Sequence, residues 1–356
     1  MIHVTKTYLP PIEDYQKYVA EIWQRGQVTN NGPLVRELEE KLKEFLGVKH
    51  LFFCTNGTIV IQLALKVLGI TKEVITTPFS YCATATAPLW ENCKPVMADI
   101  LSTDYCIDPL KVEQAINENT QAIIATHVFG NPCKLDALQN IAQKHNLKLI
   151  YDAAHAFGVS IAGKSLLSFG DISTCSFHAT KVFHTIEGGC IITDNDEYAK
   201  KISLYRSFGH VNDDYFSMGI NAKNSEFHAA MGLCVLPNLE SIIKRRKEVS
   251  EMYDSLLIGK IIRPEAMAGN FEYNYAYYPV IFDSEEKLLK VKKALEDQQI
   301  YPRRYFYPSL NTLNYIEKTE CDFADNLAPR VLCLPLFYEI TDTQVQKISN
   351  IVLNCL

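Results

Sequence analysis

The chain has 356 residues, of which 47% are apolar and 21% are charged, an ordinary balance for a globular protein. Its formal net charge of −6 offers no basic surface, so we expect no nucleic-acid partner. No apolar run reaches the ~18 residues of a membrane span, and the opening MIHVTKTYLPPIEDY has no signal-peptide core, so we expect no membrane partner either. The 11 cysteines include no C-x-x-C pair, which indicates reduced thiols in the cytoplasm and no metal site.

Seven short apolar segments alternate with helical patterns in the first two thirds of the chain. The predicted strands cover residues 50–55, 73–79, 94–100, 122–129, 148–153, 172–177 and 190–194. Apolar residues recur at helical spacing in 58–69 and again in 134–146. Such alternation predicts an α/β fold with a mostly parallel seven-stranded sheet between helices. Ligands of these sheets bind beyond the carboxyl ends of the strands.

The rest of the chain has a different pattern. A long charged helix is predicted at residues 237–257, followed by a strand segment at 274–282 and helices at 284–299 and 342–354. This order predicts a smaller α+β domain. We therefore place the domain boundary near residue 245, with residues 1–245 forming the N-terminal segment and large domain and 246–356 the small domain.

Polar residues follow several of the predicted strands. Asn56-Gly57-Thr58 opens the helix at 58–69, where free N–H groups, a small residue and a hydroxyl suit a phosphate. The alternative is a simple helix cap by Asn56 or Thr58. Asp152 ends the strand at 148–153, and a buried carboxylate there needs a cation or several donors. Its alternative role is to cap the following turn.

One lysine stands out in SFHATKVFHTIEGG, residues 176–189. Lys181 lies on the loop between two predicted strands, where a lysine by itself is usually a solvated charge. It shares one sheet edge with the phosphate cradle, with Asp152 and with Tyr81 on the loop after the strand at 73–79. Pyridoxal phosphate needs such a set: a helix N-terminus for its phosphate, a carboxylate for its ring nitrogen, a stacking aromatic and a lysine for its aldehyde.

Longer stretches resemble the nucleotide-sugar aminotransferases of the DegT/StrS type over nearly the whole chain. They are TNNGPLVRELEEKLKEFLGVKH, TNGTIVIQLALKVLGI, VITTPFSYCATA, HVFGNPCKLDALQNIAQKHNLKLIYDAAHAFG, SFGDISTCSFHATKVFHTIEGGCIITD, GINAKNSEFHAAMGL and LCLPLF. The order and spacing of these stretches carry the resemblance. It implies a pyridoxal-phosphate-dependent transferase of fold type I, with pyridoxamine 5'-phosphate as the alternate form of the cofactor.

The resemblance also implies roles for individual residues. Lys181 would be the catalytic lysine that binds the cofactor covalently. The other implied cofactor contacts are Asp152 at the pyridine nitrogen, His155 near the ring hydroxyl, Tyr81 stacked on the ring, Gly57, Thr58 and Ser176 at the phosphate, and Asn221 at the phosphate of a neighbouring subunit. The chain departs from the family pattern at Tyr151, Ala179 and Ile186, none of which removes a group that the chemistry needs. Family members that dehydrate sugars have histidine at the lysine position, so Lys181 favours amino transfer.

The substrate is the least determined part of the prediction. Within the family, the chain is most similar to transaminases that convert dTDP-4-keto-6-deoxyglucose into dTDP-4-amino-4,6-dideoxyglucose with L-glutamate as amino donor. Amination at C3 of a dTDP-3-keto-6-deoxyhexose is the alternative, and a non-catalytic binding or regulatory protein is the alternative of another class. The residues expected to contact the substrate are Asn31, Arg304, Tyr305 and Tyr307. Arg303 belongs to the same YPRRYFYPSL stretch, which could equally be a surface strand with extended arginines.

A polar segment at residues 206–219 precedes a predicted helix that begins near Glu226. GHVNDDYFSMG is too irregular to predict a strand, and a long loop inside a compact domain is usually functional. We expect this loop to cross to a second copy of the chain, so that a homodimer shares its active sites through Asn221.

Overall fold

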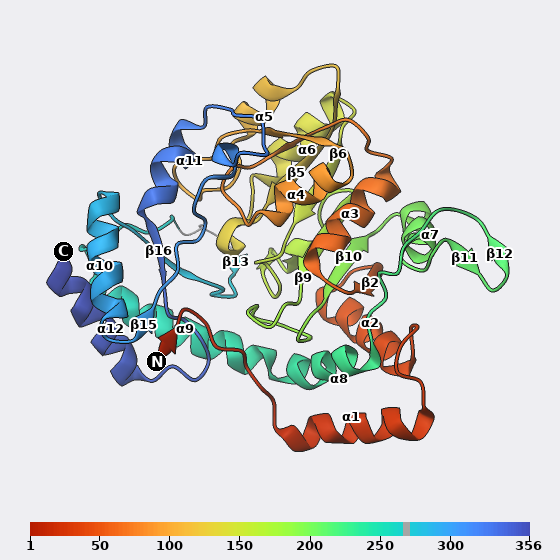
Figure 1. The fold of residues 1–356 in the computed structure, drawn as a ribbon, viewed down its shortest axis with the longest axis horizontal. Helices are drawn as coiled ribbons and strands as arrows, with labels where there is room; N and C mark the ends of the chain where they lie inside the picture. The colour runs from red at the N-terminus through yellow and green to blue at the C-terminus, as the bar shows by residue number, and fades with distance from the viewer. Residues whose placement is uncertain (266–270) are drawn as a thin grey trace.

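The computed structural model describes residues 1–265 and 271–356. Its centre is a seven-stranded sheet (Figure 1). The strands, in sheet order, are β2 (His50–Cys54), β10 (Gly189–Thr193), β9 (Ile172–Ser176), β6 (Lys148–Asp152), β5 (Thr120–Thr126), β3 (Glu73–Thr76) and β4 (Lys94–Met97). β10 is antiparallel to both of its neighbours, and the strands from β9 to β4 are parallel. The mostly parallel seven-stranded sheet predicted from the sequence is confirmed.

Both faces of this sheet are buried, which explains why its strands are nearly continuous apolar runs. In β5, Ile123 faces one core and Ile124 faces the other. The face of Ile124 is covered by α3 (Gly57–Leu68), and the face of Ile123 is packed with residues of α6 (Leu135–Lys144). The other helices of this region are α2 (Pro33–Leu46), α4 (Ala83–Trp90), α5 (Pro109–Ala115), α7 (Asp196–Tyr205) and α8 (Glu226–Val235).

The C-terminal part has its own core around an antiparallel pair, β14 (Tyr278–Ile281) and β16 (Val331–Leu334). Helices α9 (Leu239–Leu257), α10 (Glu285–Glu296) and α12 (Asp342–Cys355) pack against this pair, and α11 (Asp322–Leu327) precedes β16. Helix α9 runs without a break through residue 245, so it belongs to both parts of the chain (Figure 1). The domain boundary near residue 245 stays a prediction.

The N-terminal segment connects the two parts. β1 (Ile2–His3) pairs in parallel with β15 (Ile300–Tyr301), and α1 (Ile12–Arg25) then runs beneath α8 (Figure 1). β13 (Phe271–Glu272), β7 (Ser160–Ile161) and β8 (Lys164–Ser165) form a separate, small antiparallel sheet. Among the described residues, no helix is both long and apolar enough to cross a bilayer.

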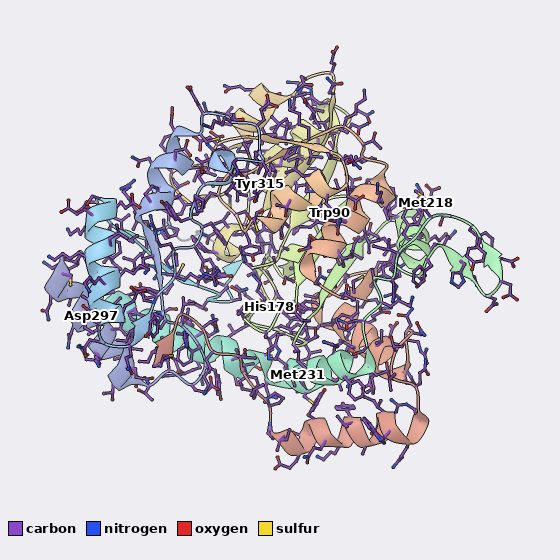
Figure 2. All side chains as sticks on the ribbon, in the orientation of Figure 1. Trp90, His178, Met218, Met231, Asp297 and Tyr315 are labelled. Carbon is purple, nitrogen blue, oxygen red and sulfur yellow. The ribbon has the colours of Figure 1, made fainter. Side chains whose placement is uncertain are left out.

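The segment at 206–219 corrects one expectation. It contains a short hairpin of β11 (His210–Val211) and β12 (Asp214–Tyr215), where the sequence predicted no strand. Asn212 adopts a left-handed backbone with φ of 51°, which asparagine tolerates and which a two-residue hairpin turn requires. The hairpin projects from the body beyond α7 (Figure 1), and Met218 lies near its base (Figure 2).

Candidate active site

A cavity of about 250 Å³ opens at the carboxyl edge of the sheet. Its walls come from the start of α3, the loop after β3, the ends of β6 and β9, and two segments of the C-terminal part around residues 277 and 303–306. Eight of the residues predicted from the sequence line it: Gly57, Thr58, Tyr81, Asp152, His155, Ser176, Lys181 and Tyr305. All of them except Tyr305 come together because the parallel strands that they follow end at this edge, and Tyr305 reaches the cavity from the C-terminal part.

Asp152 is the buried acid of the cavity. One carboxylate oxygen accepts a hydrogen bond from the Thr84 hydroxyl at 2.7 Å, and the other accepts the Ala154 N–H at 3.1 Å. Burial raises the pKa of the Asp152 carboxyl above its ordinary value, while the two hydrogen bonds and the charge of Lys181 oppose that rise. The hydrogen bond from Ala154 is the capping of the turn that the sequence left as the alternative role of Asp152. The oxygen that accepts from Thr84 is also buried, and a buried carboxylate oxygen suits a cationic ligand atom.

Lys181 extends into the same cavity from the loop after β9. Its amine donates to the Tyr277 hydroxyl at 3.4 Å. Burial lowers the pKa of the Lys181 amine below its ordinary value of 10.5, and the negative charge of Asp152 partly offsets the effect. A larger share of this amine is therefore neutral and nucleophilic near neutral pH than for an exposed lysine.

His155 lies between aromatic rings, stacked on Phe306 at 5.2 Å and meeting the edge of Tyr277 at 5.2 Å. Burial lowers the pKa of this imidazole, so the ring is neutral. Its Nδ1 atom is buried without a hydrogen-bond partner among the described residues. An unpartnered polar atom in a lined cavity is costly, which indicates that a ligand atom completes it.

At the start of α3, Asn56 caps the helix and Gly57 lies in close contact with Ser176. The Asn56 side chain accepts the N–H groups of Thr58 at 3.0 Å and Ile59 at 2.9 Å, so the capping alternative is observed. A Cβ atom on Gly57 would lie 2.8 Å from the Cβ of Ser176, so only glycine fits at this point. Thr58 and Ser176 line the cavity beside a positive helix end, an arrangement that favours a phosphate.

Four predicted residues do not line the cavity in the single chain: Asn31, Asn221, Arg304 and Tyr307. The Arg304 guanidinium donates to Glu285 at 2.6 Å and to the Pro329 carbonyl at 3.0 Å, and it lies 3.4 Å from the centre of the Tyr307 ring. Asn221 is exposed next to the hairpin and forms a backbone bridge with Ser207.

Several lining residues were missed from the sequence. Tyr277 lies in a segment that the sequence marked only as a strand. Thr84, which does not line the cavity but donates to Asp152 from behind it, lies inside a short helix. His178 and Glu187 line the edge of the cavity, with the imidazole Nε2 atom 3.5 Å from a carboxylate oxygen. His178 is on the loop after β9, near the middle of the molecule (Figure 2). The one local signal that could have found this pair is the position of His178, three residues before Lys181 in the sequence.

The residues present fit pyridoxal phosphate. The buried carboxylate, the lysine of lowered pKa, the unpartnered Nδ1 atom of His155 and the glycine beside Ser176 match its ring nitrogen, aldehyde, ring hydroxyl and phosphate. When bound, this cofactor supplies an aldehyde carbon and a ring that accepts electrons from a substrate carbon. No group of three or more His, Cys, Asp or Glu side chains within the described ranges is arranged to hold a metal ion.

A sheet of this topology with this cavity at its edge defines a pyridoxal-phosphate-dependent aminotransferase. The family model for the DegT/DnrJ/EryC1/StrS aminotransferases matches residues 11–353, and the chain belongs to this family.

Three known proteins illustrate the similarity. The dTDP-4-amino-4,6-dideoxy-D-glucose transaminase of Shigella dysenteriae is 40% identical over 362 residues, covering 99% of this chain and 98% of the relative. The GDP-perosamine synthase of Vibrio cholerae is 29% identical, with 98% of each chain covered. The solved structure of DesI in the presence of its TDP-sugar product is 30% identical, with a TM-score of 0.91 over 98% of this chain and 91% of the other.

Proposed function

We propose that this protein transfers the amino group of L-glutamate to C4 of dTDP-4-keto-6-deoxyglucose, giving dTDP-4-amino-4,6-dideoxyglucose. The observation that carries this proposal is the 40% identity with the Shigella dysenteriae transaminase, which extends over 99% of the chain. The likeness to DesI, solved with a TDP-sugar product, supports the same class of nucleotide sugar.

In this proposal three residues of the cavity have different roles in the reaction. Lys181, whose neutral form is favoured by burial, would hold the cofactor through its amine and would take a proton from the substrate carbon and return it. Asp152, fixed by Thr84 and Ala154, would hold a proton on the ring nitrogen of the bound cofactor. The neutral imidazole of His155 completes the polar contacts of the ring without adding charge.

The test is product analysis. The purified enzyme is incubated with L-glutamate and, in separate reactions, with dTDP-4-keto-6-deoxyglucose and a dTDP-3-keto-6-deoxyhexose. We expect 2-oxoglutarate and a new amine at C4, located by NMR, with Lys181→Ala as the inactive control. An amine at C3 only, or no product from either sugar, would contradict the proposed substrate.

We also propose that the active form is a homodimer in which each site receives Asn221 from the other chain. Asn221 is exposed and lies outside the cavity of its own chain, next to the projecting hairpin. Exposed apolar side chains cluster on the same segment, with Tyr215 77% and Met218 85% exposed. An apolar, projecting segment of this kind is suited to packing against a second copy.

A further inference from the structure

Arg246 of α9 is a cation that is buried without an anion. The residue is 5% exposed, and within the described residues it forms no ion pair, whereas the adjacent Arg245 binds Glu248 and Asp342. Burial lowers the pKa of the Arg246 guanidinium to about 10, so the group still carries its charge near neutral pH. A buried charge without a counter-ion is costly, so its hydrogen bonds must compensate for the loss of water.

The partners of Arg246 are two consecutive backbone carbonyls next to the cavity. Its Nε atom donates to the Tyr275 carbonyl at 2.9 Å, and its Nη2 atom donates to the Ala276 carbonyl at 2.7 Å. Asn274 fixes the same segment elsewhere, because its side-chain amide donates to the His155 carbonyl at 2.8 Å and accepts the Ala276 N–H at 3.1 Å. The segment is therefore attached both to α9 and to the loop after β6.

Tyr277 directly follows this fixed segment and reaches the reacting amine. The Lys181 amine donates to the Tyr277 hydroxyl at 3.4 Å. The Tyr277 ring meets the rings of His155 and Tyr305 edge to face, with centres 5.2 Å and 5.5 Å apart. Burial raises the pKa of the Tyr277 phenol, so the hydroxyl is neutral. A neutral acceptor is thus held in place beside the amine of Lys181.

We propose that Tyr277 is a further catalytic residue, whose hydroxyl orients the Lys181 amine for proton transfer, and that Arg246 is the residue that positions Tyr277. When the hydroxyl accepts one N–H of the neutral amine, the lone pair that takes the proton stays free and has a fixed direction. Direction matters, because a displacement of about 1 Å at a reacting group can slow a reaction by ~10²-fold. The inference rests on the proposed function, in which Lys181 moves a proton of the amino donor.

The first measurement is the rate of the amino-donor half of the reaction, followed in the holoenzyme as the change in cofactor absorbance with saturating glutamate. Tyr277→Phe keeps the ring and should slow this rate by about 10-fold or more, while the half-saturating glutamate concentration stays within about twofold of the wild type. Tyr273→Phe is the matched control, because Tyr273 lies outside the cavity lining and its hydroxyl donates to the Phe129 carbonyl at 2.7 Å. It should leave the rate unchanged. A normal rate in Tyr277→Phe, or an equal fall in both variants, would overturn the role of the Tyr277 hydroxyl.

A double-mutant cycle tests Arg246. Arg246→Met removes both donors to the segment and should slow the same step by a factor similar to that of Tyr277→Phe. In the double variant the two effects should not multiply, because Arg246 acts through the Tyr277 hydroxyl. Arg245→Met is the control and should leave the rate unchanged. Multiplying effects, or a normal rate in Arg246→Met, would overturn the positioning role. If Arg246→Met does not fold, the same cycle is measured with Arg246→Lys, which keeps the charge and a donor but not the fork.

The last measurement needs neither turnover nor cofactor. An acceptor at the Lys181 amine favours its charged form, so in protein freed of cofactor Tyr277→Phe should lower the pH midpoint for labelling Lys181, read by peptide mass spectrometry, and Tyr273→Phe should not. The other groups that act on the charge of this amine are the same in both variants: Asp152, Cys175, Tyr305 and Tyr81. An unchanged midpoint in Tyr277→Phe would overturn the contact. If the wild type does not react with glutamate, the proposed donor is wrong, and this titration still tests Tyr277.

Discussion

Burial shifts the pKa values of Lys181 and Asp152 in opposite directions, because leaving water disfavours the charged form of each group. The pKa of the Lys181 amine falls below 10.5, so in the protein without cofactor this amine should deprotonate at lower pH than an exposed lysine. We expect the pH midpoint for labelling Lys181 with an amine-reactive reagent, read by peptide mass spectrometry, to lie below the ordinary lysine value of 10.5. In the holoenzyme, borohydride should fix the cofactor to the same peptide.

A midpoint for Lys181 at or above 10.5 would contradict the lowered pKa. A borohydride-stable label on another lysine would contradict its assignment as the residue that holds the cofactor.

Substitution of Asp152 tests how much its negative charge contributes to turnover. Asp152→Asn keeps the shape and the bond from Ala154 and removes the charge that holds the proton on the ring nitrogen. We expect turnover to fall on the order of 10²-fold or more, as for other lost electrostatic partners, and cofactor affinity to fall less. Steady-state kinetics and a cofactor titration measure the two effects separately. Near-normal turnover would show that Asp152 acts only as the cap of the turn at Ala154.

At the scale of elements, α2 depends on a residue from another helix. Gly32 precedes the helix and no side chain of its own segment caps it. Instead Glu226, at the start of α8, accepts the N–H groups of Leu34 at 3.0 Å and Val35 at 2.9 Å, and Arg25 lies 3.3 Å away. A Cβ at Gly32 would lie 2.4 Å from the Glu226 carboxyl carbon, so this glycine is required for the approach.

Replacement of Glu226 should therefore destabilise the fold. Glu226→Ala leaves two buried N–H groups without their acceptor and leaves Arg25 with Glu21 alone, and we expect a loss of about 3–5 kcal/mol in the free energy of unfolding. Glu226→Gln keeps one acceptor oxygen and should cost less. Denaturant unfolding of both variants measures the difference. Equal stability of Glu226→Ala and the wild type would show that α2 does not need this cap.

At the scale of the whole molecule, the shared-site dimer is tested by complementation. Lys181→Ala and Asn221→Ala chains, each inactive, are mixed under conditions that allow subunit exchange. Mixed dimers should regain roughly one working site, because one interface then carries both intact groups. No recovery despite proven exchange would place Asn221 outside the site, and a fully active monomer in sedimentation would reject the dimer model.

The sequence by itself determined the seven strands, the residues at their carboxyl ends and the family. These depend on local patterns: apolar runs that alternate with helical periodicity, and polar residues that follow strands whose ends must meet. Lys181, Asp152 and Gly57 could be found in this way, since each lies at or shortly after the end of a predicted strand, whereas the role of His155 came from the family resemblance.

Only the tertiary structure decided which residues from the distant parts of the chain reach the cavity. Arg303 and Arg304 are adjacent in the sequence, yet one lines the cavity and the other binds Glu285. Tyr277 meets Lys181 across 96 positions, and Glu226 caps a helix by accepting the N–H of Leu34, which lies 192 residues earlier. No local pattern encodes such pairs, because their distances are set by how separately formed elements pack together.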